Sequence, residues 1–106
     1  MTNMKSRVLD LYGSLDAIEL RYLQLPNEVI LEFTLDGKPH LIRFMEPVRR
    51  EPFLAVFDDC WGIRIHDINQ EHQQYIEIGR YRVEFWDEDN PISGICVDRF
   101  EHTVLD

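Results

Sequence analysis

The chain has 106 residues, of which 44% are hydrophobic, and a formal net charge of −9 at pH 7. This size and composition fit one folded domain over residues 1–106 and exclude a disordered tail, and the surplus of acids argues against nucleic acid or an anionic membrane as a partner. No apolar run approaches the roughly 20 residues that span a bilayer, and the N-terminus lacks the apolar stretch of a signal peptide, so we expect a soluble, cytoplasmic protein.

The entire net charge lies in the second half of the chain. Residues 1–50 contain seven acids and seven bases, whereas residues 51–106 contain thirteen acids and four arginines. A concentrated negative field attracts basic surfaces and repels nucleic acid and anionic lipid. The charge distribution therefore predicts the kind of partner, a basic protein, rather than the fold.

The first segment has helical spacing. A short amphipathic helix is predicted over about residues 3–13, ending at Gly13, because one helical stripe would collect several apolar side chains. These are Met4, Val8, Leu11, Tyr12 and Leu15. A strand over residues 7–12 is the alternative, because the apolar residues there are nearly continuous.

From Ala17 onward the apolar spacing changes to two. Ile18, Leu20 and Tyr22 alternate with charged residues, which predicts a strand with one buried and one solvated face. A turn at residues 25–27 then leads into the next apolar run.

Asp36-Gly37 predicts a two-residue hairpin turn, because both central positions of a type I′ turn need a positive φ. The turn sets the register of the two flanking strands, with Leu35 opposite Lys38. The apolar side chains that then share one face are Val29, Leu31, Phe33, Ile42 and Phe44. Pro39 cannot donate to a strand ladder, so its strand is expected to begin there or to lie on an edge.

The second half of the chain continues as apolar runs separated by polar turns. Residues 53–57 contain no polar side chain, which predicts a central strand buried on both faces. Further strands are predicted over residues 61–68, within residues 75–86 and over residues 94–104, with an exposed turn at residues 87–91.

One N-terminal helix followed by about seven to eight short strands, over a β region of residues 17–104, predicts a mainly β fold. The expected architecture is a single antiparallel β-sandwich or a partly open barrel, with the helix covering one end or edge. The strand order is not predicted.

No catalytic or cofactor-binding motif is present, so we expect neither an enzyme nor a cofactor. Gly-rich phosphate loops and nucleophile elbows are absent, and Cys60 and Cys96 belong to no CxxC pair. The two cysteines are expected to be buried free thiols. Acidic neighbours also disfavour the thiolate of Cys60.

Only one local cluster contains several metal-ligand types: His66-Asp67 followed by Glu71-His72. A strand that runs into a loop could bring such side chains together around a divalent ion, but no cysteine lies nearby to complete a zinc site. We therefore predict a solvated strand face here and keep a small metal-dependent enzyme as the weaker alternative.

Each tryptophan adjoins a dense acidic turn. Aromatic side chains inside a polar rim are typical of interface hot spots, and acidic rims accelerate docking onto basic proteins. If the two turns are neighbours in space, they form one acidic face. The predicted partner-binding residues are Asp58, Asp59, Trp61, Trp86, Asp87, Glu88 and Asp89.

In size, net charge and compactness, the chain resembles the small acidic immunity proteins with which bacteria neutralise basic nuclease toxins, although no aligned motif supports the resemblance. The resemblance implies an inhibitor that occupies a nucleic-acid site. The leading hypothesis is thus a non-enzymatic protein-binding module for a basic protein. A self-associating structural or regulatory β domain, possible as a homodimer through a sheet edge or the N-terminal apolar stripe, is the alternative.

Overall fold

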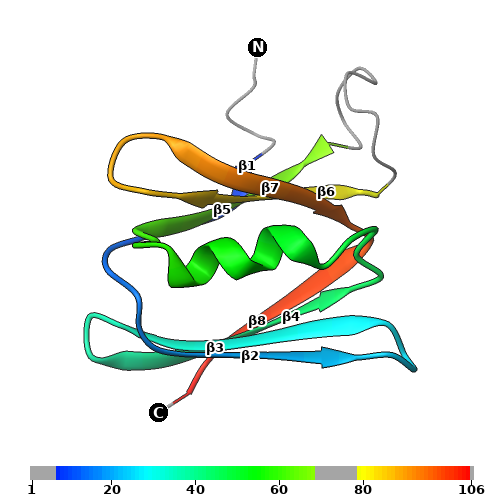
Figure 1. The fold of residues 1–106 in the computed structure, drawn as a ribbon, viewed down its shortest axis with the longest axis horizontal. Helices are drawn as coiled ribbons and strands as arrows, with labels where there is room; N and C mark the ends of the chain where they lie inside the picture. The colour runs from blue at the N-terminus through cyan, green and yellow to red at the C-terminus, as the bar shows by residue number, and fades with distance from the viewer. Residues whose placement is uncertain (1–6, 69–78, 106) are drawn as a thin grey trace.

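The computed structural model describes residues 7–68 and 79–105. Within them, eight strands form two antiparallel sheets that pack face to face as a β-sandwich, which confirms the predicted fold class (Figure 1). One sheet has the order β1-β5-β6-β7 and the other the order β2-β3-β4-β8.

The elements of the first half are β1 (Arg7–Tyr12), β2 (Asp16–Leu23), β3 (Glu28–Leu35), β4 (Lys38–Met45) and the 3₁₀ helix η2 (Glu51–Phe57). Those of the second half are β5 (Gly62–Asp67), β6 (Tyr81–Trp86), β7 (Pro91–Val97) and β8 (Arg99–Val104). The chain passes from one sheet to the other after β1, between β4 and β5, and between β7 and β8. No helix in the described ranges is long and apolar enough to cross a membrane.

The β3–β4 hairpin has the predicted turn and register. Asp36 and Gly37 both have a positive φ, 53° and 78°, and Leu35 pairs with Lys38. The apolar face of the hairpin therefore packs into the core. Pro39 lies at the second position of β4, as one alternative predicted, but β4 runs between β3 and β8 and is not an edge strand.

The prediction of a helix over residues 3–13 is wrong within the described part, because residues 7–12 form β1. Leu9 and Leu11 pack against the core, whereas Val8 and Tyr12 are 45% and 59% exposed. This alternation suits an edge strand that pairs with β5, and it places Leu11 on the opposite face from Val8 and Tyr12. The proposed helical stripe for self-association therefore does not exist, and Met4 lies outside the described residues.

The predicted strand over residues 53–57 is also wrong, because this run forms η2. Phe53 and Val56 are buried, whereas Leu54 and Phe57 are 52% and 54% exposed. A 3₁₀ helix repeats every three residues, so each pair shares one side of the helix. Pro52 stands in the first turn, where its missing N–H and fixed φ are tolerated. Hydrophobicity alone could not distinguish this short run from a strand.

The predicted last strand over residues 94–104 is divided in two. β7 ends at Val97 and β8 begins at Arg99 in the opposite sheet. Asp98 stands between them, and its amide donates to the carbonyl of Met45 over 3.0 Å. The change of sheet accounts for the break in alternation near Phe100, since the inward-facing positions must be reset when the chain crosses.

A cluster of aromatic rings joins η2 to both sheets. The ring of Phe53 lies 5.0 Å from that of Phe44 in β4 and 5.7 Å from that of Phe85 in β6. All three side chains are fully buried. Thus η2 covers one open side of the sandwich and contributes to the core (Figure 1). Cys60 and Cys96 are buried and form no disulfide, as predicted.

Two histidines share a hydrogen bond inside one end of the sandwich. Nδ1 of His40 lies 2.9 Å from Nε2 of His102, so one ring donates and the other accepts. The ring of His40 also stacks on Phe33 at 5.2 Å. Burial lowers the pKa of both histidines, and nearby Lys38 lowers the pKa of His40 further against the opposing effect of Asp36. The proximity of His40 adds to the lowering for His102.

We expect this pair to make the fold less stable as the pH falls. An unfolded histidine takes up a proton near pH ~6.5, whereas the folded pair has a lower pKa and resists protonation. The contribution to the free energy of unfolding is therefore complete above about pH 6.5 and decreases as the pH falls from there through the lowered folded pKa values. Chemical denaturation at a series of pH values measures the slope.

The double variant His40→Gln/His102→Gln should show a flatter pH dependence over this range. His66→Gln is the matched control, because it removes a histidine on the outer face of the other sheet and leaves the His40–His102 pair intact. If the double variant keeps the slope of the wild-type protein, the His40–His102 pair is not its source.

Candidate functional site

Two acidic turns meet at one end of the β1-β5-β6-β7 sheet. The first connects η2 to β5 and the second connects β6 to β7. Gly62 at the start of β5 pairs with Trp86 at the end of β6, which brings the two turns together. They enclose a hollow of about 560 Å³, lined by Asp58, Asp59, Trp61, Asp87, Glu88, Asp89 and Ile92.

The second turn is held rigidly by Asp87. Its Oδ1 accepts hydrogen bonds from the amides of Asp89 and Asn90, over 2.8 and 2.6 Å. These two bonds lower the pKa of the Asp87 carboxyl, because they stabilise its ionised form. Glu88 and Asp89 are exposed at the tip of the turn. The hollow thus has fixed negative charge along one wall.

The first turn is fixed by its backbone. The amide of Asp58 donates to the carbonyl of Ala55 over 3.0 Å and ends η2, and Asp59 adopts a positive φ of 52°. Cys60 then turns inward, where its Sγ donates to the carbonyl of Gly62 over 3.3 Å. Burial raises the pKa of this thiol, which makes it a poor nucleophile.

Aromatic and aliphatic side chains complete the hollow. The Trp61 amide donates to the Trp86 carbonyl over 2.7 Å, which joins the two turns directly. The Trp61 ring lies 6.1 Å from that of Tyr12, the last residue of β1. Ile92 contributes a side chain that is 39% exposed. Tyr12 and Ile92 were not predicted as site residues, because neither stands beside an acid in the sequence.

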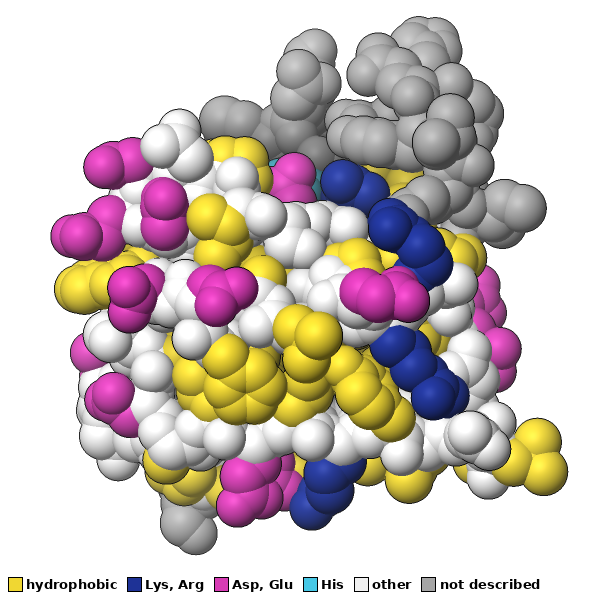
Figure 2. All heavy atoms as spheres, viewed as in Figure 1, with side chains coloured by type: hydrophobic (Ala, Val, Ile, Leu, Met, Phe, Trp, Pro, Cys, Tyr) yellow, Lys and Arg dark blue, Asp and Glu magenta, His cyan; other side chains and the backbone are white. Residues whose placement is uncertain are grey.

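Within the described residues, the five carboxylates of the hollow form no ion pair, whereas carboxylates elsewhere do. Arg43 binds buried Glu28 over 2.9 Å, Arg21 binds Glu32 over 3.1 Å and Arg80 binds Asp67 over 3.1 Å. Arginines therefore neutralise these three acids, and the five carboxylates at the hollow have no such partner within the described residues. Figure 2 shows Asp and Glu side chains gathered at the left of the molecule, where the β6–β7 hairpin lies.

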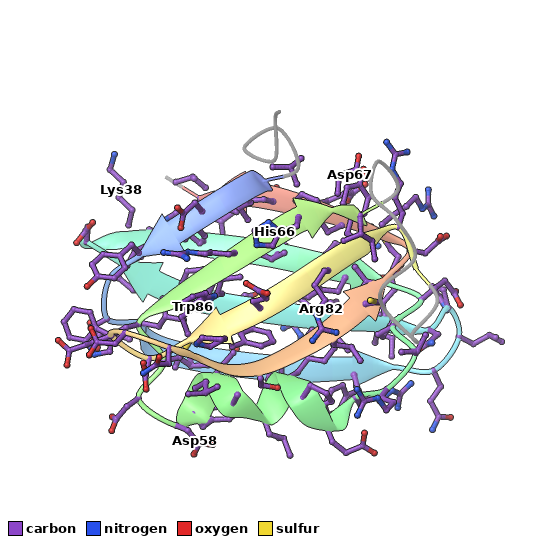
Figure 3. All side chains as sticks on the ribbon, turned by 90° about the horizontal axis from the view of Figure 1, so that it is seen from above. Lys38, Asp58, His66, Asp67, Arg82 and Trp86 are labelled. Atoms are coloured by element: carbon purple, nitrogen blue, oxygen red, sulfur yellow. The ribbon has the colours of Figure 1, made fainter. Side chains whose placement is uncertain are left out.

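Trp86 does not line the hollow, although the sequence suggested it. Phe85 points into the core, so Trp86, the next residue of the strand, faces outward from the sheet. The guanidinium of Arg64 lies 4.1 Å from the centre of the Trp86 ring, and Nε1 of Trp86 donates a hydrogen bond to Glu84 over 3.1 Å. Figure 3 shows Trp86 on the outer face of this sheet, in the same layer as Arg82 and His66. Its role there is to pack against the charged network of that face.

The candidate metal cluster is divided by strand geometry. His66 bonds to Glu84 over 3.3 Å on the outer face, whereas its neighbour Asp67 is buried and bound to Arg80. Consecutive residues of a strand point to opposite faces, so these two cannot converge on one ion. Glu71 and His72 lie outside the described residues. Among the described residues, no three or more His, Cys, Asp or Glu side chains are placed so that they could hold a metal ion.

The fold and the hollow together define a small antiparallel β-sandwich that presents uncompensated carboxylates beside exposed aromatic and aliphatic side chains. Comparisons of the chain with protein-family models, with curated proteins and with solved structures find no match. Any assignment of function therefore depends on the chemistry of this surface.

Proposed function

We propose that the protein is a non-enzymatic binding module that docks on a basic protein through the acidic hollow. The observation that carries the proposal is the convergence of two turns, distant in the sequence, that place five carboxylates around one hollow. Fixed charges on rigid turns attract a complementary surface and lose little conformational entropy when the surface docks.

An inhibitory role follows from the same chemistry. A protein that binds nucleic acid presents cationic side chains toward phosphates, and closely spaced carboxylates can occupy that groove instead. The partner expected on this basis is a nuclease or another nucleic-acid-binding protein, and the proposed activity is that of an immunity-type inhibitor. We propose no catalytic role, because four of the five acids of the hollow are exposed and the nearby Cys60 is not an activated nucleophile.

A matched pair of charge reversals tests the proposal. Asp58→Lys/Glu88→Lys places cations in the hollow, whereas Glu19→Lys/Glu101→Lys makes the same change in net charge on the outer face of the opposite sheet. All four side chains are exposed, so both variants should fold. Circular dichroism and thermal unfolding verify that they do.

We expect the wild-type protein and the control variant to retain a basic partner from an extract of the source cells. Once the partner is purified, calorimetry should show affinity about 100-fold weaker for the hollow variant, and weaker binding of the wild-type protein at higher ionic strength. If the partner is a nuclease, the wild-type protein should block its activity and the hollow variant should not. Equal affinities for the two variants, or a partner without a basic surface, would refute the proposal.

A further inference from the structure

The outward side of η2 carries two exposed apolar side chains, Leu54 and Phe57, after Glu51 in its first turn. Leu54 and Phe57 are three residues apart, so they lie on the same side of the 3₁₀ helix, and each is about half exposed. Figure 2 shows hydrophobic side chains gathered across the middle of this face of the molecule. Large apolar side chains that adjoin one another on a surface are typical of interaction sites.

This apolar side continues directly into the acidic hollow. Phe57 immediately precedes Asp58, and Ser93 Oγ in β7 donates to the Pro52 carbonyl over 2.9 Å, so β7 runs beside η2. Ile92, the neighbour of Ser93, lines the hollow. We call Leu54, Phe57, Ile92 and the carboxylates of the hollow the docking face.

The opposite end of η2 carries charges of both signs. The guanidinium of Arg50, the residue before η2, lies 5.4 Å from the centre of the Tyr22 ring and donates to the Leu23 carbonyl over 3.0 Å. Glu51 in the first turn of η2 stands beside Arg50, whereas only acids, Asp58 and Asp59, directly follow the end of the helix. Cationic side chains of a ligand are therefore favoured at the end of η2 that adjoins the hollow.

We propose that the docking face binds an amphipathic segment of the basic partner, with apolar side chains on Leu54 and Phe57 and lysine or arginine side chains in the hollow. This inference rests on the proposed function and adds an apolar contact, at Leu54 and Phe57, to the acidic one. Charge steers the encounter, and burial of the apolar residues slows dissociation.

Two synthetic peptides of equal length and equal positive charge serve as probes. In the first, a cluster of lysines is followed by leucines at helical spacing. In the second, serines replace the leucines. Fluorescence anisotropy measures the affinity of each peptide, and chemical-shift perturbation in ¹⁵N-labelled protein locates the contact.

The wild-type protein should bind the lysine–leucine peptide about tenfold more tightly than the lysine–serine peptide, with perturbed amides in η2 and at the hollow. Phe57→Ser and Leu54→Ser should abolish most of this preference and leave the affinity for the lysine–serine peptide unchanged. Leu25→Ser is the matched control, because Leu25 is 96% exposed in the β2–β3 turn, away from the docking face, and its removal should change neither affinity.

The outcomes separate the two proposals. If wild-type protein binds both peptides equally and Asp58→Lys/Glu88→Lys weakens both, the apolar half of the contact is refuted and the acidic site stands. If neither peptide binds, or if perturbed amides lie away from η2, the inference is overturned, and the partner experiment with the charge-reversed variants decides the proposed function separately.

Discussion

Replacing Phe53 with alanine is expected to lower the free energy of unfolding by about 3–5 kcal/mol. The side chain is fully buried and packs against Phe44 of one sheet and Phe85 of the other. Its removal therefore leaves a cavity where η2 joins both sheets, and close packing allows only partial collapse around the cavity. Denaturant titration at neutral pH measures the loss.

Phe57→Ala is the matched control, because the same substitution is made in the same helix on its exposed side. It should cost less than about 1 kcal/mol. The pair also tests the conformation of this segment. In a strand, residues 53 and 57 would lie on the same face, and the two substitutions would have similar effects. A cost for Phe57→Ala close to that of Phe53→Ala would contradict the 3₁₀ helix.

Gly79→Ala is expected to destabilise the fold by about 2–4 kcal/mol, through two additive effects. Gly79 has a φ of 152°, which other residues rarely adopt. A Cβ atom there would also lie 2.9 Å from the carbonyl oxygen of Val97 and 3.1 Å from its nitrogen. These are backbone atoms of β7, held in the sheet by β6, so they cannot move aside cheaply.

Gly37→Ala separates the two effects. Gly37 also has a positive φ, but no heavy atom lies within 4 Å of a Cβ built there. This substitution should cost only the conformational term, about 1–2 kcal/mol. Thermal and chemical unfolding of both variants measure the difference. If Gly79→Ala costs no more than Gly37→Ala, the close approach of Val97 is not a constraint in solution.

Local rules predicted the parts of the fold that depend on neighbours in sequence. The Asp36-Gly37 turn determined the register of β3 and β4 because turn geometry and alternation agree there. Alternation likewise identified β2, β5 and β6. The errors occur where a short apolar run fits two periodicities, as in β1 and η2, or where the chain changes sheets at Asp98.

The candidate site was accessible to sequence reasoning only in part. Two dense acidic turns stand out in the sequence, and six of the seven predicted residues line one hollow. Trp86 is the exception because side chains alternate along a strand: Phe85 points into the core, so Trp86 points outward. The proximity of the turns depends on the β5–β6 pairing, whose connection gives no hairpin signal. The exposure of Leu54 and Phe57 was not predicted, because residues 53–57 were expected to form a strand buried on both faces.

The fold divides its charged residues between two structural settings. Ion pairs such as Arg43–Glu28 lie on sheet faces, where they compensate one another. The hollow contains acids without such partners within the described residues. The pairs on the sheet faces therefore cancel part of the charge there, whereas the five acids at the hollow keep theirs.

The pairing of Gly62 with Trp86, together with the hydrogen bond from the Trp61 amide to the Trp86 carbonyl, anchors both acidic loops by main-chain atoms. Main-chain anchors do not depend on which side chains the loops carry. Homologues could therefore exchange the other loop residues and acquire new binding preferences, provided that they keep Asp87, whose side chain holds the second turn, and Gly62, which has no room for a Cβ atom.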